Sequence, residues 1–319
     1  MKAYTIGPND AGQRLDRYLS KLLPRAPQGV IYQSLRKKKV KINGRRCTDG
    51  SLRLQAGDLA ELYISDEYFA SPAGQPLWTR LEPELNVIYE DRHILVMDKP
   101  AGLPSQADGE TASLEAHMRA YLLRTGAFAP EKEATFLPSL CHRIDRNTAG
   151  LVIGAKDAES LRILNQKIRD REIRKFYLCE TEGTPEPEFG EIAGWLTKDG
   201  AERRMEFSPR PVPCGMPCKT RYRVLRPGNP ALVEAELLTG RTHQIRAGFA
   251  SLGHPLVGDV KYGARKDGGR RFQHLTAYRL VFAFASDSGP LDYLKGKEIT
   301  LTPGTLPARR EVRDGYRNI

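Results

Sequence analysis

The stretch that decides the fold lies in the middle of the chain, at residues 140–153, and reads LCHRIDRNTAGLVI. Its single carboxylate, Asp145, stands between Arg143 and Arg146 in a polar loop that leads into the apolar residues 151–153. A buried strand directly behind a loop holds that loop rigid, which suits a reacting group. The two guanidinium groups would keep Asp145 ionised and available as a nucleophile or base. Taken by itself, however, the segment fits a structural ion pair or a turn better than a catalytic group.

The chain around this segment predicts one large mixed domain. Strand-like runs occur at residues 87–89, 93–97, 151–155, 175–179 and 231–237, and helix-like runs at 113–124, 157–169 and 242–252. Strands and helices mixed in this way indicate an α+β domain, which we place at residues 84–319. Residues 66–83 mix Pro, Gly and Ser without a period and are expected to form a linker.

The first 65 residues carry most of the positive charge. The chain has 319 residues, with 50 Lys and Arg against 39 Asp and Glu, and a net charge of +11. Residues 1–65 hold 13 of the cations and five of the acids, so this fifth of the chain accounts for +8. A small basic module joined to a nearly neutral larger one indicates a nucleic-acid partner, although a basic surface can also serve only solubility.

The same 65 residues predict a compact αβ module. Apolar residues spaced i, i+3, i+4 and i+7 predict an amphipathic helix over 14–23, and a second helix is expected over 30–38. Asn43-Gly44 between extended segments predicts a hairpin, and residues 59–64 predict a closing strand. The second helix and the hairpin would bring six candidate RNA-binding cations together: Arg36, Lys37, Lys38, Lys41, Arg45 and Arg46.

Both parts of the chain resemble known families. Residues 12–65, with RLDRYLS, VKINGRR and LQAGD, resemble the S4 RNA-binding domain. Between residues 86 and about 282, four motifs in order (DRHILVMDKPAGLPS, the HRID segment, REIRKFYLC and LTGRTHQIR) resemble the RluA-type family of RNA pseudouridine synthases. This resemblance implies the pseudouridine-synthase fold, a mixed and largely antiparallel sheet with a central cleft flanked by helices. It also implies an isomerase that needs no cofactor and no metal.

The resemblance also implies which residues react. Asp145 matches the family's catalytic aspartate, which attacks C1′ of the uridine or removes a C2′ proton, and the sequence does not choose between these routes. Arg246 is expected to pair with Asp145. Tyr177 is expected to stack on a uracil that has left the RNA stack, while Ile245 packs on the other side of the base or in the core. The two arginines that flank Asp145 are candidate contacts for the RNA strand.

The composition indicates in which compartment the protein is expected and which partners it is expected to bind. Five cysteines spread over a long chain do not form a disulfide framework, and no apolar run approaches the roughly 20 residues of a membrane span. The N-terminus lacks the apolar stretch of a signal peptide. We therefore expect a cytoplasmic monomer that binds RNA and no membrane. Large-subunit ribosomal RNA is the expected substrate because of the S4-like module. The alternatives are a transfer-RNA synthase and a non-catalytic RNA-binding or ribosome-assembly protein.

Overall fold

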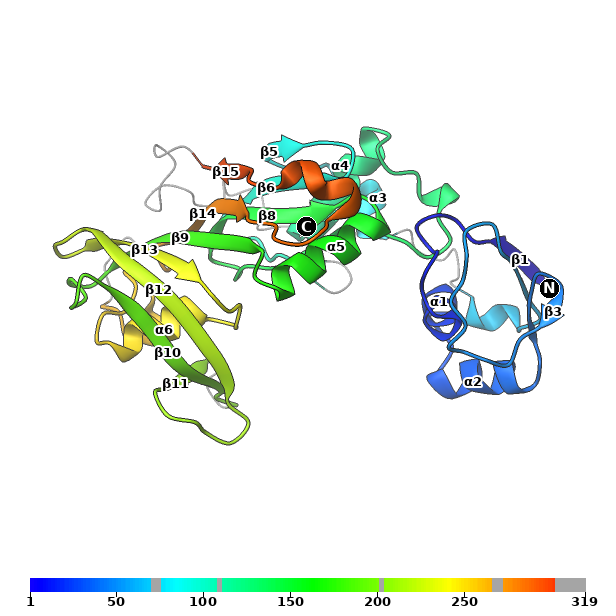
Figure 1. The fold of residues 1–319 in the computed structure, drawn as a ribbon, viewed down its shortest axis with the longest axis horizontal. Coiled ribbons are helices and arrows are strands. Elements are labelled where there is room, and N and C mark those ends of the chain that lie inside the picture. The colour runs from blue at the N-terminus through cyan, green and yellow to red at the C-terminus, as the bar shows by residue number, and fades with distance from the viewer. Residues whose placement is uncertain (70–75, 108–110, 201–203, 266–271, 302–319) are drawn as a thin grey trace.

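The computed structural model describes the chain except for residues 70–75, 108–110, 201–203, 266–271 and 302–319. It contains two separate sheets, a four-stranded one near the N-terminus and an eleven-stranded one in the rest of the chain. Figure 1 shows the N-terminal sheet and its two helices at one end of the molecule, apart from the long sheet. Among the described helices, none combines the length and apolar character that crossing a bilayer requires.

The N-terminal unit is a small antiparallel sheet covered by two helices. Its elements are β1 (Lys2–Thr5), α1 (Leu15–Leu22), α2 (Gln28–Arg36), β2 (Val40–Ile42), β3 (Arg45–Arg46) and β4 (Leu59–Leu62), and the strand order is β1-β4-β2-β3. Leu15 and Leu19 of α1 are fully buried against Leu35 of α2 and Leu62 of β4, as the helical spacing of the apolar residues predicts. The expected helices, hairpin and closing strand of this unit are all present.

The hairpin turn forms because two adjacent residues accept left-handed backbone angles. Asn43 has φ 52° and Gly44 has φ 75°, a conformation that Asn and Gly adopt more easily than other residues. The Asn43 side chain also accepts a hydrogen bond from the Leu59 backbone N–H at 2.9 Å and donates one to Asp58 at 2.8 Å. The turn is therefore tied to the start of β4.

The long sheet carries the rest of the architecture. Its strands are β5 (Val87–Glu90), β6 (Ile94–Lys99), β7 (Ser139–Leu140), β8 (Ala149–Ala155), β9 (Ile173–Thr181), β10 (Phe189–Lys198), β11 (Met205–Ser208), β12 (Met216–Arg226), β13 (Ala231–Leu237), β14 (Leu275–Phe282) and β15 (Glu298–Thr300). The main order is β11-β10-β12-β13-β9-β14-β8-β6-β5, with β15 beside β14 and β7 beside β8. β8 pairs with β14 in parallel, and the other pairs are antiparallel. The expected α+β fold with a largely antiparallel sheet is confirmed.

The parallel contact between β8 and β14 depends on a glycine. Gly150 has φ +113°, and a Cβ atom there would lie 2.1 Å from the backbone oxygen of Ala277. Only glycine allows the two strands to approach so closely. Because Gly150 follows the Asp145 loop by a few residues, this contact places the end of the loop against β14.

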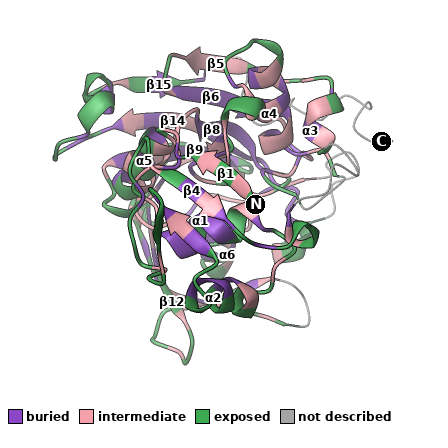
Figure 2. Ribbon diagram, turned by 90° about the vertical axis from the view of Figure 1, so that its right-hand side faces the viewer, coloured by how far each residue is buried: buried purple, intermediate pink, exposed green. Residues whose placement is uncertain are grey.

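Helices cover the sheet and bury its central strands. They are α3 (Leu77–Arg80), α4 (Leu114–Arg124), α5 (Ala158–Arg169) and α6 (Gln244–Ser251), with 3-10 turns η1 (Asp66–Tyr68), η2 (Pro130–Lys132), η3 (Val260–Tyr262) and η4 (Gly289–Leu294). Ser113 caps α4 and Asp157 caps α5, each through a side-chain oxygen that accepts a backbone N–H. β6 and β8 are buried along their whole length (Figure 2).

Hydrogen bonds join the N-terminal unit to the larger one. The Asn9 side chain donates to Glu133 at 2.7 Å and accepts from the Ala158 backbone N–H at 3.0 Å. Arg162 of α5 donates to the backbone oxygen of Ala11 at 2.9 Å. These contacts hold the basic module against the first two turns of α5 and the segment after η2.

Parts of the larger unit differ from the pattern expected from the sequence. The long strands β10, β12 and β14 have no counterpart among the expected runs, because their glycines, arginines and polar residues weaken the strand pattern. The segment expected as a linker contains η1 and α3, and Trp78 of α3 packs against Phe128 at a ring-centroid distance of 6.2 Å. The boundaries 1–65, 66–83 and 84–319 remain proposals.

Candidate active site

A cleft of about 1020 Å³ opens beside the Asp145 loop. Three segments that are distant in the sequence form its walls: residues 142–148, the C-terminal end of α5 with the first half of β9, and residues 236–246. Asp145, Tyr177 and Arg246 all line this cleft, together with Arg143, Arg146 and Ile245. Every residue that the sequence resemblance assigns to the reacting site therefore lies in one cavity.

An arginine from α6 connects two carboxylates in this cleft. Arg246 donates from Nη1 to Asp145 Oδ2 at 3.2 Å, and it donates from Nε and Nη2 to the two oxygens of Asp259 at 2.7 and 2.8 Å. The Arg246 side chain is 8% exposed and that of Asp259 is 2% exposed, whereas Asp145 remains 25% exposed. Burial disfavours the charge of Arg246, but Asp259 and then Asp145 raise its pKa above the usual value. The guanidinium is thus fixed on its inner side and presents one nitrogen to the accessible carboxylate.

Two polar side chains, those of Lys99 and Ser105, form hydrogen bonds to the backbone of the Asp145 loop. Lys99 is fully buried, and its ammonium donates to the carbonyl oxygens of Pro100, Leu103 and Arg146 at 2.7–2.8 Å. Ser105 accepts from the Ile144 N–H and donates to the Ile144 carbonyl. Burial lowers the pKa of Lys99 to about 7, while Asp145 opposes this shift. Both sides of Asp145 are therefore anchored through their backbone.

His243 is a site residue that the sequence reasoning missed. Its Nε2 lies 3.8 Å from Asp145 Oδ2, and its Nδ1 is 2.8 Å from the Tyr262 hydroxyl. His243 has φ 54°, an uncommon left-handed angle that precedes α6 and turns the ring toward the cleft. Burial lowers the pKa of His243, and the charge of Asp145 partly offsets this effect. The Tyr262 ring in turn lies 5.0 Å from the Arg246 guanidinium carbon.

Asp259 was also missed, although it lies close behind a quoted motif. The sequence segment Gly258-Asp259 follows GRTHQIR closely, but nothing in its spacing indicates that this carboxylate reaches back to Arg246. A lone carboxylate in a segment of apolar and glycine residues, shortly after a motif that contains a buried arginine, is the signal that could have found it.

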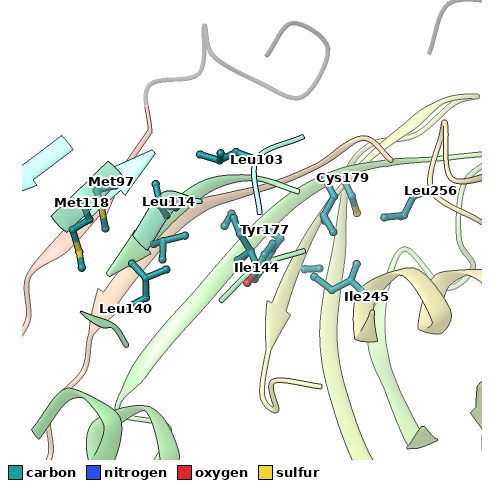
Figure 3. Packing of buried hydrophobic residues seen from close by; sticks show 14 of the residues in the cluster. Met97, Leu103, Leu114, Met118, Leu140, Ile144, Tyr177, Cys179, Ile245 and Leu256 are labelled. Atoms are coloured by element: carbon teal, nitrogen blue, oxygen red, sulfur yellow. The ribbon is translucent and has the colours of Figure 1, made fainter. Parts of the chain in front are cut away.

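Two buried side chains, Tyr177 and Ile245, also line the cleft. Tyr177 and Ile245 are 5% and 3% exposed, and both belong to the main hydrophobic cluster. Figure 3 shows Tyr177 on β9 beside Ile144, with Ile245 at the start of α6 nearby. Burial and then the charge of Asp145 raise the pKa of Tyr177. The tyrosine therefore stays neutral at physiological pH and offers a flat apolar surface next to the carboxylate.

The arginines that flank Asp145 in the sequence do not hold its carboxylate. Arg143 and Arg146 are exposed on the rim of the cleft, and neither forms an ion pair with Asp145 in the described part of the chain. The effect of these two arginines on the charge of Asp145 stays a prediction, whereas the expected pairing of Arg246 with Asp145 is present. In a tight loop, consecutive side chains diverge, so the guanidinium that contacts Asp145 comes from a position 101 residues further along the chain.

The six basic residues expected to bind RNA lie elsewhere. Arg36, Lys37 and Lys38 are exposed at the end of α2, and Arg45 and Arg46 are exposed on β3. Arg46 donates to the Lys38 carbonyl at 3.2 Å, and Lys41 pairs with Arg46 across the hairpin. Lys38, Lys41 and Arg46 are thus neighbours, a common RNA-binding surface of all six stays a prediction, and none of the six lines the Asp145 cleft.

Family models match both parts of the chain. An RNA pseudouridylate synthase model matches residues 93–251, and an S4 domain model matches residues 13–59. The ribosomal large subunit pseudouridine synthase C of Vibrio cholerae is 32% identical over 268 residues, which are 82% of this chain and 80% of the relative. The chain belongs to the RNA pseudouridine synthases. It is thus an isomerase that converts uridine to pseudouridine in RNA, and the family resemblance of the sequence is confirmed.

Other members of the RNA pseudouridine synthases resemble the chain over similar lengths. The ribosomal large subunit pseudouridine synthase C of Escherichia coli K12 is 32% identical and covers 83% of this chain and 81% of its own. An uncharacterized RNA pseudouridine synthase of Mycoplasma capricolum is 28% identical over 97% of this chain and its own full length. The solved structure of human RNA pseudouridylate synthase domain containing 1 has the same fold, with a TM-score of 0.55, 24% identity, and coverage of 71% of this chain and 88% of its own.

Nowhere in the described ranges do three or more His, Cys, Asp or Glu side chains gather in a way that could hold a metal ion. Cys218 is buried on β12, and Cys214 is exposed just before that strand.

Proposed function

We propose that the protein isomerises specific uridines of large-subunit ribosomal RNA and that Asp145 is its catalytic carboxylate. The observation that carries this proposal is the chain of contacts from Asp145 to Arg246 to Asp259 inside the cleft. Breaking the bond between C1′ and N1 leaves positive charge on the sugar, and a fixed carboxylate beside C1′ stabilises that charge. Of these three connected side chains, Asp145 is the most accessible, so it is the group that meets the ribose.

The reaction balances without a second substrate. Uracil leaves C1′ through N1, turns, and rejoins through C5; the C5 hydrogen is released as a proton and N1 gains one. Asp145 can form a bond to C1′, or it can take the C2′ proton so that the sugar becomes a glycal. Arg246 keeps the attacking oxygen in one direction in either case, because Asp259 prevents the guanidinium from turning away.

Two buried side chains of the cleft support a role in holding the detached base. Tyr177 and Ile245 are buried side chains on two different elements that both face the cleft. A uracil that has left the RNA stack can lie on the tyrosine ring while its sugar reaches Asp145. A flat contact of this kind lets the base rotate between the two bonded forms. Arg143 and Arg146 are exposed at the cleft entrance, where they can hold the flanking strand.

Large-subunit ribosomal RNA is favoured as the substrate for two reasons. The relatives in Vibrio cholerae and Escherichia coli are named as ribosomal large subunit synthases, and the S4 domain places a basic surface on the same molecule. Because ribosomal RNA is the proposed substrate, we also propose a cytoplasmic location. We propose that the protein acts as a monomer.

A map of pseudouridines in a deletion strain tests this choice. Carbodiimide-treated ribosomal and transfer RNA is compared by primer extension between the deletion strain, a strain complemented with the wild-type chain, and one complemented with Asp145→Asn. Loss of large-subunit stops that only the wild-type chain restores supports the proposal. Loss of transfer-RNA stops would indicate the transfer-RNA alternative, and unchanged maps would indicate a non-catalytic RNA-binding protein.

A further inference from the structure

One lysine in the cleft wall has no acidic or carbonyl partner within the described residues. Lys175 is on β9, two residues before Tyr177, so both side chains project from the same face of the strand. Its side chain is only partly exposed and lines the cleft. Burial lowers the pKa of Lys175, and no neighbouring charge in the described part of the chain offsets this shift. The ammonium is therefore able to bind a group from outside the protein.

A glycine across the cleft leaves this ammonium accessible. A Cβ atom on Gly240 would have one described neighbour within 4 Å, the Lys175 Nζ at 3.7 Å. The backbone conformation at residue 240 does not require a glycine, because the φ angle there lies outside the left-handed region. A larger side chain there would cover the ammonium. The two residues therefore form an open cationic position between β9 and the loop that precedes α6.

The wall around Lys175 carries more positive than negative charge. Arg169 and Arg171, at the end of α5 and the start of the following turn, are exposed and line the same cleft, as does Arg241 on the opposite loop. Glu236 is an acidic residue on this wall, and Arg174 and Arg221 already bind it at 2.7 and 3.2 Å. The charge near Lys175 is therefore available to an external anion.

Lys175 forms no hydrogen bond or ion pair with the reacting carboxylate in the described part of the chain; the contacts of Asp145 go to Arg246 and His243. The charge of Asp145 shifts the pKa values of Tyr177, Lys99 and His243, but burial alone shifts that of Lys175. If the ribose of the target uridine meets Asp145 and its base lies on Tyr177, the ammonium faces the next part of the RNA strand. The anionic group of RNA that is present at every nucleotide is the backbone phosphate.

We propose that Lys175, framed by Gly240, binds a backbone phosphate of the substrate RNA adjacent to the flipped uridine, and that the strand leaves the cleft past Arg169 and Arg171. This inference rests on the proposed function of the cleft. It assigns the strand a direction: from the carboxylate, along β9, toward the end of α5. The contact positions the nucleotide and does not take part in bond making.

The test compares two lysine substitutions in the full-length protein. Lys175→Gln removes the cleft cation, and Lys297→Gln removes a partly exposed lysine that lies over the Tyr89 ring and outside the cleft. The RNA is a large-subunit ribosomal transcript labelled with tritium at uridine C5, since bond formation at C5 releases the label. Binding is measured from 50 to 300 mM salt in an Asp145→Asn background, and turnover is measured with Asp145 intact.

We expect Lys175→Gln to raise Kd and KM roughly tenfold, as the loss of a hydrogen bond to a charged group does. It should reduce the slope of log K against log salt by about 0.7, the value for one single-strand phosphate, and leave kcat within about twofold. Lys297→Gln should change none of these. Lys175→Arg should recover part of the affinity, and Gly240→Val should lower affinity without changing the charge.

Three results would overturn the inference. An unchanged salt slope in Lys175→Gln means that no phosphate is bound there. A large loss of kcat at unchanged affinity means that Lys175 acts on the uracil. A comparable loss in Lys297→Gln means that the effect is only net charge. If the wild-type protein releases no tritium, the proposed function fails on this RNA, while the binding slopes still decide the phosphate contact. Thermal unfolding confirms that each variant is folded.

Discussion

The Asp145 cleft and the basic surface of the N-terminal unit use arginine in opposite ways. Arg246 is nearly inaccessible, and three of its hydrogen bonds go to two carboxylates. Arg36 and Arg45 are exposed, and no carboxylate within the described residues forms an ion pair with them. A buried, fully engaged guanidinium has one orientation and can direct a reacting group. An exposed one keeps its freedom and can meet phosphates of many geometries, which gives affinity that depends on salt.

The largest effect should come from the carboxylate that the cleft holds. Asp145→Asn keeps the shape of the side chain but removes its charge, so we expect isomerisation to fall by more than about 1000-fold. RNA affinity should stay within a few-fold, because the basic surface is untouched. Tritium release from labelled RNA and filter binding measure the two quantities. Turnover by the variant close to the wild-type rate would mean that Asp145 is not the catalytic carboxylate.

A smaller effect should follow when Arg246 loses its inner partner. Asp259→Asn leaves a buried guanidinium with one carboxylate, and we expect a loss of about 3 kcal/mol in unfolding free energy. The freed guanidinium would also let Asp145 shift, so kcat should fall by roughly 100-fold while Kd for RNA is unchanged.

Asp157→Asn provides the control for this prediction. Asp157 is another partly buried aspartate, which caps α5 and binds His93 at 3.0 Å outside the cleft. Its loss should lower stability, measured by urea unfolding, without a change in kcat. Equal kcat losses in both variants would show that general destabilisation explains the effect and that Asp259 does not position Arg246.

The basic surface should respond through affinity alone. In the double variant Arg45→Gln/Arg46→Gln we expect the slope of log K against log salt to fall by roughly 0.7–0.9 for each phosphate that the variant no longer binds. The rate of the bound complex should stay the same, because neither side chain lines the cleft. Filter binding over a salt series, with single-turnover kinetics at saturating protein, separates the two. A lower single-turnover rate would show that the basic surface contributes to the reaction as well as to binding.

The smallest effect concerns a neutral group in the cleft floor. Burial lowers the pKa of His142 to about 3, and its Nε2 accepts the Ile153 backbone N–H at 3.2 Å, which requires the neutral ring. The unfolded chain binds a proton on this histidine below about pH 6.5, whereas the folded chain resists until about pH 3. Stability is therefore lost as pH falls through this window, by up to about 1.4 kcal/mol per unit.

His142→Gln should remove this dependence, since glutamine offers an oxygen to the same N–H and does not titrate. Urea unfolding at pH 7, 6 and 5 should show the wild-type protein losing more stability than the variant at each step. Parallel losses in the two proteins would show that His142 is not kept neutral by the fold.

Local elements were predictable wherever a short-range rule decides them. The helical spacing of Leu15 and Leu19 and the Asn43-Gly44 turn depend on a few adjacent residues, and the structure confirms both. The strands β10 and β12 were not predictable in this way. They pair with each other and with β13, and their stability comes from neighbours rather than from their own sequence pattern.

The features of the site also separate into those that the sequence determines and those that depend on the tertiary structure. By itself, the sequence determined the segment that carries Asp145, the family to which the chain belongs, and the charge of its first 65 residues, because motif order and composition are written along the chain. The family resemblance also implied that Arg246 pairs with Asp145, and the tertiary structure brings the two side chains into contact. Only the tertiary structure decided that Asp259 and His243 complete the cluster and that Lys175 lines the same cleft. Such contacts join residues far apart in sequence, and they exist only because β9, β14, α6 and the loop in front of β8 meet at one cavity.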